Sequence, residues 1–133
     1  MENILNLTIV IPTVGEKSLL EVIKNLNSNI SIPKKILVVI YKRNLIKIDK
    51  KIKNYDNVEI ATTNSPGQVH QRVEGFKLAK TDFVMQLDAD CFIDNHSIIE
   101  MMDFLKSHDK ASVGPCFLDI KNNLPIHKFI DEF

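Results

Sequence analysis

The chain has 133 residues and a mass of 15.2 kDa, which predicts one domain over residues 1–133 with room for a single core. Hydrophobic residues make up 44% and charged residues 26%, proportions that exclude a disordered tail and a membrane-embedded protein. Lysine plus arginine and aspartate plus glutamate both number 17, so no overall basic field exists to attract nucleic acid, and no nucleic-acid partner is expected.

Targeting features also point to an intracellular protein. Glu2 stands where a signal peptide would carry positive charge, and the apolar run that follows ends at Pro12. The apolar stretch Ile36 to Tyr41 is too short to cross a bilayer, so we expect no transmembrane segment. Cys91 and Cys116 make a poor disulfide framework and are interpreted as reduced thiols, which favours a cytoplasmic location.

The first half of the chain alternates strands with helical or connecting segments. "LTIVIP" (7–12) predicts a buried strand, and "GEKSLLEVIKNLNSN" (15–29) predicts a helix. "KKILVVIY" (34–41) predicts a second strand, the lysine-rich stretch 43–57 a connector or short surface helix, and "VEIATT" (58–63) a third strand. The apolar residues of the first helix recur at helical spacing: Leu19, Leu20, Ile23 and Leu26.

The second half continues the alternation. Residues 69–79 predict a helix whose apolar residues face the sheet, and "DFVMQL" (82–87) predicts the fourth strand. Asp94 or Asn95 is expected to cap a further helix, "ASVGPCF" (111–117) predicts a fifth strand, and the remaining residues have no clear period. The apolar residues expected to face the sheet are Val69, Val73, Phe76 and Ala79, and those of the last helix are Ile98, Ile99, Met102 and Leu105.

This alternation predicts an α/β fold with a mainly parallel sheet and helices on both faces. Ligands of such sheets bind at the carboxyl ends of the strands. Those ends are predicted at Pro12–Thr13, Ile40–Tyr41, Thr62–Thr63 and Asp88–Asp90.

Two carboxylates follow the fourth predicted strand. In an extended segment residues i and i+2 point to the same side, so Asp88 and Asp90 are able to converge on one point. Carboxylate oxygens suit Mg²⁺ or Mn²⁺, held partly by protein and partly by a diphosphate. A solvated turn or a helix cap is the alternative, and the spacing alone does not decide between them.

Several neighbours favour the metal interpretation. Arg72 lies in the helix before the carboxylate strand, between Gly67, which permits a tight turn, and Gly75, which permits close packing. A guanidinium there is able to bind phosphate oxygens, although Arg72 taken alone is better explained as a surface arginine of the helix. Glu16 follows the first strand, where it is either a ligand-binding residue or an acid favoured by the helix dipole, and Thr13 is a turn hydroxyl or a site residue.

With these residues placed, the chain resembles the amino-terminal half of an inverting family 2 glycosyltransferase. "LTIVIPTVGE" is similar to the opening strand of that family, with proline and then glutamate at Pro12 and Glu16. "NSPGQVHQRVEGFKLAKTDFVMQLDADCF" is similar to its asparagine, glycine, arginine, glycine and acidic-motif sequence. The matching positions in that stretch are Asn64, Gly67, Arg72, Gly75, Asp88 and Asp90.

The resemblance implies a GT-A (Rossmann-like) nucleotide-diphospho-sugar transferase core that is short, with the acceptor-binding half missing or minimal. It implies a divalent metal cofactor, Mn²⁺ or Mg²⁺, held by Asp88 and Asp90, with Asp90 preferred as direct ligand. It also implies that a nucleotide-sugar donor is bound by Arg72 at the phosphates and by other residues at the nucleoside, and that the sugar passes to an acceptor hydroxyl. The implied donor-binding residues are Pro12, Thr13, Glu16, Tyr41, Asn64, Arg72 and Asp88.

Two departures from the family leave questions open. Ile40 and Tyr41 stand where many relatives place an aspartate that reads uracil, so the base is open and Tyr41 is a candidate to stack on it. Relatives continue well past the acidic motif, and no general base is identified in this chain. A non-catalytic nucleotide-sugar-binding or interaction module is therefore the alternative to an enzyme. If it is an enzyme, we expect either a fragment of a longer one or a natural short form that needs a partner, and a homo-oligomer or a partner subunit is among the expected partners.

Overall fold

The computed structural model describes residues 3–114, 118–119 and 124–125. The chain divides into two compact units, Met1–Asn95 and His96–Phe133. Helix α3 (Asn95–Ser107) begins at the last residue of the first unit, and the second unit also holds a short antiparallel pair, β5 (Leu118–Asp119) with β6 (Leu124–Pro125). The first unit contains the main sheet and every site residue named above.

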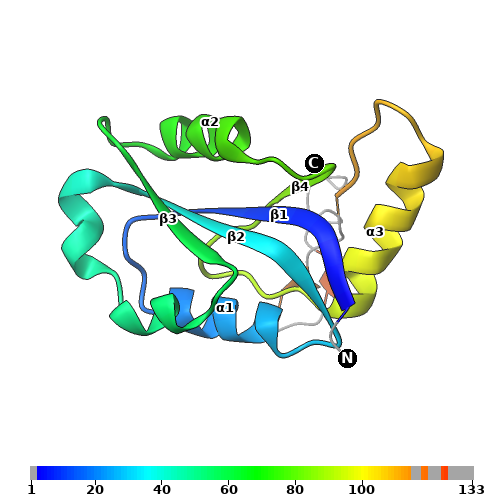
Figure 1. Cartoon of the computed structure of the whole chain (residues 1–133), viewed down its shortest axis with the longest axis horizontal. Helices are drawn as coiled ribbons and strands as arrows, with labels where there is room; N and C mark the ends of the chain where they lie inside the picture. Colours follow the sequence, from blue (N-terminus) through cyan, green and yellow to red (C-terminus); the bar gives the residue numbers. More distant parts are fainter. Residues whose placement is uncertain (1–2, 115–117, 120–123, 126–133) are drawn as a thin grey trace. The chain divides into compact units, whose positions relative to one another are not determined.

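The main sheet has four strands in the order β3-β2-β1-β4, and all three of its pairings are parallel. This arrangement confirms the predicted parallel sheet and brings the four carboxyl ends to one edge (Figure 1). The strand bounds are β1 (Asn3–Thr13), β2 (Ser31–Tyr41), β3 (Val58–Thr63) and β4 (Phe83–Gln86).

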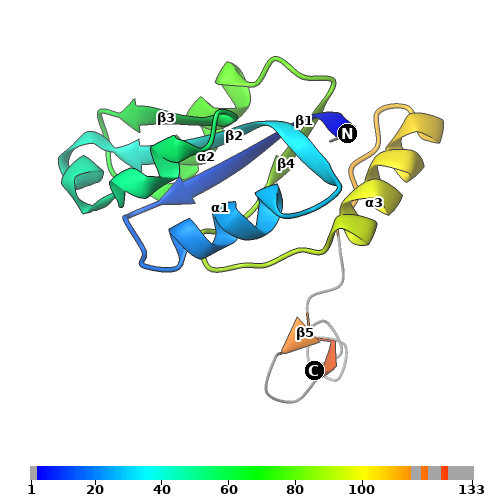
Figure 2. The ribbon, with the colours of Figure 1, turned by 60° about the horizontal axis from the view of Figure 1, so that its bottom comes forward.

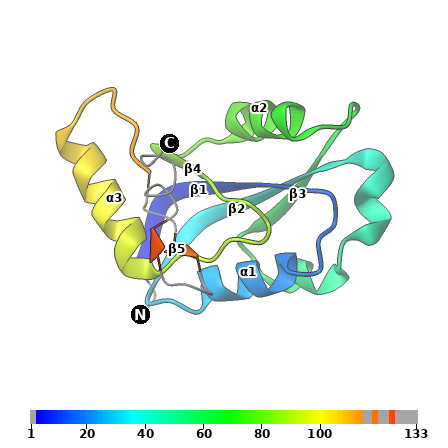
Figure 3. The ribbon, with the colours of Figure 1, turned by 180° about the vertical axis from the view of Figure 1, so that it is seen from behind.

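Helices cover both faces of this sheet, as predicted. Helix α1 (Leu19–Asn27) lies on one face and helix α2 (Gln68–Leu78) lies on the other (Figures 1 and 3). Helix α1 is shorter than the predicted 15–29, and Leu20 is only half-buried. Its fully buried side chains are Leu19, Val22, Ile23 and Leu26.

The register of the strands decides which side chains face which helix. Val10 of β1 pairs with Leu37 of β2, and both belong with Val39 to one buried cluster. This cluster lies on the α2 face, because a Cβ added to Gly75 of α2 would stand 2.3 Å from Cγ1 of Val10. Alternation along the strands then turns the intervening apolar residues toward the α1 face. Those residues are Ile9, Ile11, Ile36, Val38 and Ile40, all of them completely buried.

The predicted orientation of α2 is wrong. Val69, Val73 and Phe76 are 70%, 47% and 46% exposed, whereas Gln71 and Gly75 are the buried residues of the helix. The reason is the close approach of α2 to the sheet, since only a residue without a side chain fits above Val10. That contact fixes the rotation of the helix about its axis. The apolar residues at helical spacing, Val69, Val73 and Phe76, therefore point away from the sheet.

The lysine-rich connector consists of two 3-10 helices, η1 (Lys42–Lys47) and η2 (Lys50–Asn54), so the predicted connector or short surface helix is confirmed (Figure 2). It leaves β2 at the carboxyl edge of the sheet. Ile52 is its buried anchor.

The remaining differences concern the later part of the chain. Residues 111–114 form no strand, and residues 115–117 of the predicted fifth strand lie outside the described residues. Helix α3 begins at Asn95, where a helix start was predicted, and Nδ2 of the Asn95 side chain donates to the carbonyl of Ser31 (2.9 Å). Within the described ranges, no helix is long and apolar enough to span a bilayer.

Candidate functional site

The candidate site lies at the carboxyl edge of the sheet, on the loop that follows β4. The amide of Leu87 donates to the carbonyl of Val10 (3.0 Å), so pairing with β1 continues one residue past β4. The chain then turns at Ala89 and Asp90, and the amide of Cys91 closes the turn by donating to the carbonyl of Asp88 (3.1 Å). The buried strand thus ends in a short, hydrogen-bonded acidic turn.

Asp88 faces α2. Val10 pairs with Gln86, so the alternation that turns Val10 toward α2 also turns Gln86 and Asp88 toward it. Nη2 of Arg72 lies 3.4 Å from Oδ1 of Asp88, and Nε2 of Gln86 lies 3.5 Å from the same oxygen. The pairing of Arg72 with Asp88, which the sequence places 16 residues apart, is a product of the fold.

The ion pair between Arg72 and Asp88 is open to solvent. Their side chains are 33% and 47% exposed, and a long, partly exposed pair of this kind contributes little to stability. Nη2 of Arg72 also donates to the amide oxygen of Gln68 (3.2 Å). Its Nε is buried and has no hydrogen-bond partner within the described part of the chain. The guanidinium therefore retains donor capacity in this site.

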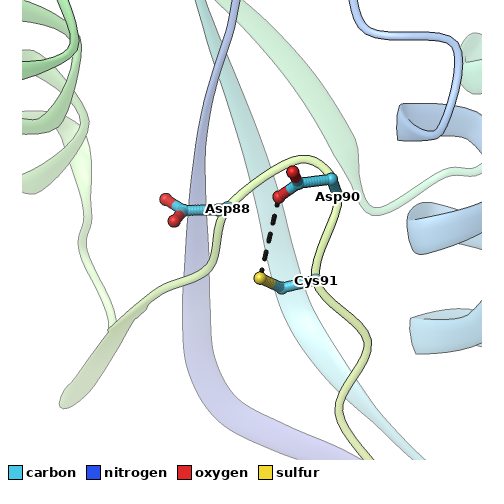
Figure 4. A group of neighbouring side chains, drawn as sticks. All are labelled: Asp88, Asp90 and Cys91. Atoms are coloured by element: carbon cyan, nitrogen blue, oxygen red, sulfur yellow. Dashed lines mark hydrogen bonds between the residues drawn. The ribbon is translucent and has the colours of Figure 1, made fainter. Parts of the chain in front are cut away.

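Asp90 and Cys91 complete the acidic turn (Figure 4). One oxygen of Asp88, one of Asp90 and the sulfur of Cys91 lie within 4.8 Å of one another. The thiol of Cys91 donates to Oδ1 of Asp90 (3.7 Å). Burial raises the pKa of that thiol, and the charges of Asp90 and Asp88 and the hydrogen bond to Asp90 raise it further. Cys91, which was not among the predicted site residues, is therefore a neutral neighbour of two carboxylates.

The donor set of this turn fits a hard divalent cation. Two carboxylates supply oxygen ligands of the kind that Mg²⁺ and Mn²⁺ prefer, and a thiol held protonated does not add a soft thiolate ligand. Oδ1 of Asp88 is already shared by Arg72 and Gln86, while Asp90 is exposed. Asp90 is thus the more accessible of the two carboxylates.

The loop between β1 and α1 is closed by its own side chains. The hydroxyl of Thr13 donates to Oε2 of Glu16, and the amide of Val14 donates to the same oxygen (3.1 Å). The amide of Gly15 donates to the hydroxyl of Thr13 (2.9 Å). Thr13 and Glu16, which the sequence proposed as site residues, lie together, and in this structure they hold the loop in shape.

Two further residues connect neighbouring elements to this edge. The hydroxyl of Ser18 donates to the carbonyl of Ala89 (2.8 Å), which ties the start of α1 to the acidic turn. Nε2 of Gln71 donates to the carbonyls of Thr13 (2.6 Å) and Val39 (2.7 Å), which ties α2 to the ends of β1 and β2. Neither residue was predicted, because an isolated serine before a helix or an isolated glutamine within one carries no local signal of such contacts.

The other predicted donor-binding residues are spread along the edge. Pro12 is buried in β1. Its backbone nitrogen, which carries no hydrogen, points to the same side of β1 as the carbonyl of Val10, toward β4. It lies beyond Val10 and Gln86, the last pair of residues that joins these two strands. Tyr41 is half-buried at the end of β2, where it pairs with Thr63, and Asn64 is exposed in the turn after β3.

A hollow of about 300 Å³ adjoins the β1–α1 loop. Glu16 lines it from the loop and Asp49 lines it from the η1–η2 connector. The loop and the connector touch, because a Cβ on Gly15 would stand 2.5 Å from Cβ of Lys47. The full lining is Gly15, Glu16, Lys17, Leu19, Leu20, Lys47, Ile48, Asp49 and Ile52.

Comparison with known proteins agrees with this geometry. The profile of Glycosyl transferase family 2 matches residues 8–128, which is most of the chain. The chain belongs to this family. The match includes the second half of β1 from Thr8, the acidic turn and every predicted site residue between them. No curated protein sequence matches the chain.

Solved structures support the fold. The chain is similar to TarS of S. aureus, with 20% identity and a TM-score of 0.62 over 86% of this chain and 23% of that one. A shorter structure, TarS 1-349, gives 19% identity and a TM-score of 0.62 over 92% and 43%. The 4-diphosphocytidyl-2C-methyl-D-erythritol synthase from Anaerococcus prevotii DSM 20548 gives 16% identity and 0.54 over 90% and 60%. The sheet and its helices are thus a Rossmann-like GT-A core, and the chain spans less than half of either TarS structure.

Proposed function

We propose that this family 2 domain binds a nucleotide-sugar donor through a divalent cation and serves the transfer of the sugar to an acceptor hydroxyl. The observation that carries the proposal is the convergence of Asp88, Asp90 and Arg72 at the carboxyl edge of a parallel sheet. Two carboxylates and a guanidinium form a site able to bind a cation together with an anion. A diphosphate carrying Mg²⁺ or Mn²⁺ has both charges.

Each residue of the site has a definite role in this proposal. Asp90, the exposed carboxylate, contacts Mn²⁺ or Mg²⁺ directly, and Asp88 assists while it keeps Arg72 in place. Arg72 binds phosphate oxygens, for which it has an unused donor in Nε. Gln86 holds the second hydrogen bond to Asp88 and so limits the rotation of that carboxylate.

The chemistry that this site supports is stabilisation of a leaving group. The bound cation supplies Lewis-acid stabilisation of the nucleoside diphosphate as the bond to the sugar breaks. Arg72 adds positive charge beside the same phosphates. Pro12, Thr13, Glu16, Tyr41 and Asn64 are proposed to border the nucleoside, with Tyr41 as the side chain that stacks on the base.

The half-buried free thiol of Cys91 supports a cytoplasmic location for this reaction, because free thiols persist in reducing compartments.

The proposal is tested by titrating the protein with UDP-, GDP-, CDP- and ADP-sugars, with Mn²⁺ or with a chelator. The unmodified protein is expected to bind one class of donor in a metal-dependent manner. Asp90→Asn should weaken donor binding in Mn²⁺ by more than about tenfold. In chelator, where donor binding is already weaker, the variant and the unmodified protein should bind the donor equally. Asp56→Asn, which alters an exposed carboxylate in the turn before β3, is the matched control.

Two outcomes would overturn the assignment: equal loss in Asp56→Asn, or full metal-dependent affinity in Asp90→Asn. A second measurement, release of nucleoside diphosphate, separates an enzyme from a donor-binding module. Turnover supports the transferase, whereas metal-dependent binding without turnover supports the alternative function, a module that binds the donor without catalysing transfer.

A further inference from the structure

The strongest charge asymmetry of the molecule lies in the connector that contains η1 and η2. Residues 42–54 hold six basic residues and one acid, so this stretch carries a net charge of +5 while the remainder of the chain carries −5. The formal net charge of zero therefore conceals a strongly basic connector. Its basic residues, all exposed, are Lys42, Arg43, Lys47, Lys50, Lys51 and Lys53.

The one acid of the connector offsets only one of its six positive charges. The carboxylate of Asp49 accepts a hydrogen bond from the backbone amide of Lys51 (2.9 Å) and caps η2. None of the six basic side chains takes part in an ion pair within the described residues. Like charges on one short connector repel each other, so a partner with negative charge would relieve the repulsion.

The same connector also exposes apolar side chains at its tip. Ile46 is 92% exposed and Leu45 is 43% exposed, and both lie between Arg43 and Lys47. Ile52, in contrast, is completely buried and anchors η2 to the rest of the unit. The connector is thus anchored through Ile52 and exposes two aliphatic side chains, Leu45 and Ile46, that cations flank in the sequence.

We propose that the η1–η2 connector docks this domain onto a membrane surface rich in anionic lipid. Clusters of four to eight lysine and arginine residues bind acidic headgroups, at about 1 kcal/mol or roughly fivefold in affinity for each residue near the surface. An aliphatic tip adds to this by entering the boundary between headgroups and acyl chains. Single-stranded nucleic acid, the other polyanion to consider, is bound by surfaces that add aromatic side chains for stacking, and residues 42–54 contain none.

Docking in this way has a consequence for the candidate site. Lys47 touches the β1–α1 loop at Gly15, and that loop holds Glu16 at the carboxyl edge of the sheet. A membrane bound by the connector therefore lies beside the edge where the donor is proposed to bind. The acceptor class that this arrangement suits is one presented at the membrane surface.

The test is sedimentation of the protein with vesicles of phosphatidylcholine, alone or mixed with phosphatidylglycerol, at low and high salt. Binding is expected for the mixed vesicles alone and should weaken with salt. Lys50→Gln with Lys51→Gln should reduce affinity about 25-fold. Ile46→Ser should reduce it roughly tenfold, since the tip loses its apolar burial.

Two matched controls separate docking from general charge and hydrophobicity. Lys77→Gln with Lys80→Gln removes two exposed lysines at and after the end of α2, and Ile30→Ser removes an isoleucine that is 82% exposed before β2. Both should bind within about twofold of the unmodified protein. Equal losses in the controls, absence of binding to anionic vesicles at low salt, or binding to RNA but to no vesicle would overturn the proposal. The assay contains no nucleotide, so it stands apart from the test of the proposed function.

Discussion

Gln71 offers the sharpest test of how the site is held together. Its Nε2 donates to the carbonyl oxygens of Thr13 and Val39 at 2.6 and 2.7 Å, and the side chain is 1% exposed. Gln71→Glu preserves the shape and replaces this donor by an oxygen. An ionised carboxylate there would lie at hydrogen-bond distance from two carbonyl oxygens. It would have no hydrogen to donate to either of them, and it would be buried away from water.

The expected cost follows from the pKa of the new carboxyl group. Burial among acceptors raises the pKa of a glutamate from about 4.3 to about 7 or higher. A rise of roughly three units in this pKa corresponds to a loss of about 4 kcal/mol in the free energy of unfolding at pH 7. Because the folded-state pKa is raised, the loss of stability is small below about pH 4 and grows as the pH rises toward the folded-state value.

The assay is urea denaturation followed by circular dichroism, for the variant and the unmodified protein, from pH 4 to pH 7.5. Gln68→Glu is the control, because Gln68 is an exposed residue at the start of the same helix, and its stability should change by less than about 0.5 kcal/mol. A pH-independent difference below about 1 kcal/mol for Gln71→Glu would refute the role of the buried amide.

Two other predictions concern packing and electrostatics. Gly75→Ala should destabilise the protein by about 1–2 kcal/mol, because the new Cβ would lie 2.3 Å from Cγ1 of Val10 and this outweighs the higher helix propensity of alanine. In a double-mutant cycle read by urea denaturation, Val10→Ala should reduce that cost, and additive losses would contradict the close contact. Asp90→Asn should lower the pKa of the Cys91 thiol, since it removes a neighbouring negative charge and leaves only a neutral, weaker acceptor for the thiol hydrogen. The pH dependence of alkylation in chelator, with Cys116→Ser as background, measures this shift, and an unchanged profile would contradict it.

The main sheet was determined largely by the sequence. The stretches "IVIP" (9–12) and "ILVVI" (36–40) are apolar at every position, which is typical of strands buried on both faces, and the segments between them required parallel pairing. The carboxyl ends of parallel strands share one edge, so the position of Asp88 and Asp90 at that edge followed without knowledge of the structure. Gly75 was likewise predicted to permit close packing, and its contact with Val10 confirms this.

The orientation of α2 was decided by tertiary structure alone. The periodicity of Val69, Val73 and Phe76 predicted the apolar face as the buried one, but the helix lies too close to the sheet for that face to fit. Periodicity describes which residues share a face, whereas the distance between helix and sheet decides which face is turned inward. The hydrogen bonds of Gln71 and the pairing of Arg72 with Asp88 depend on that rotation, so they required the fold to be known.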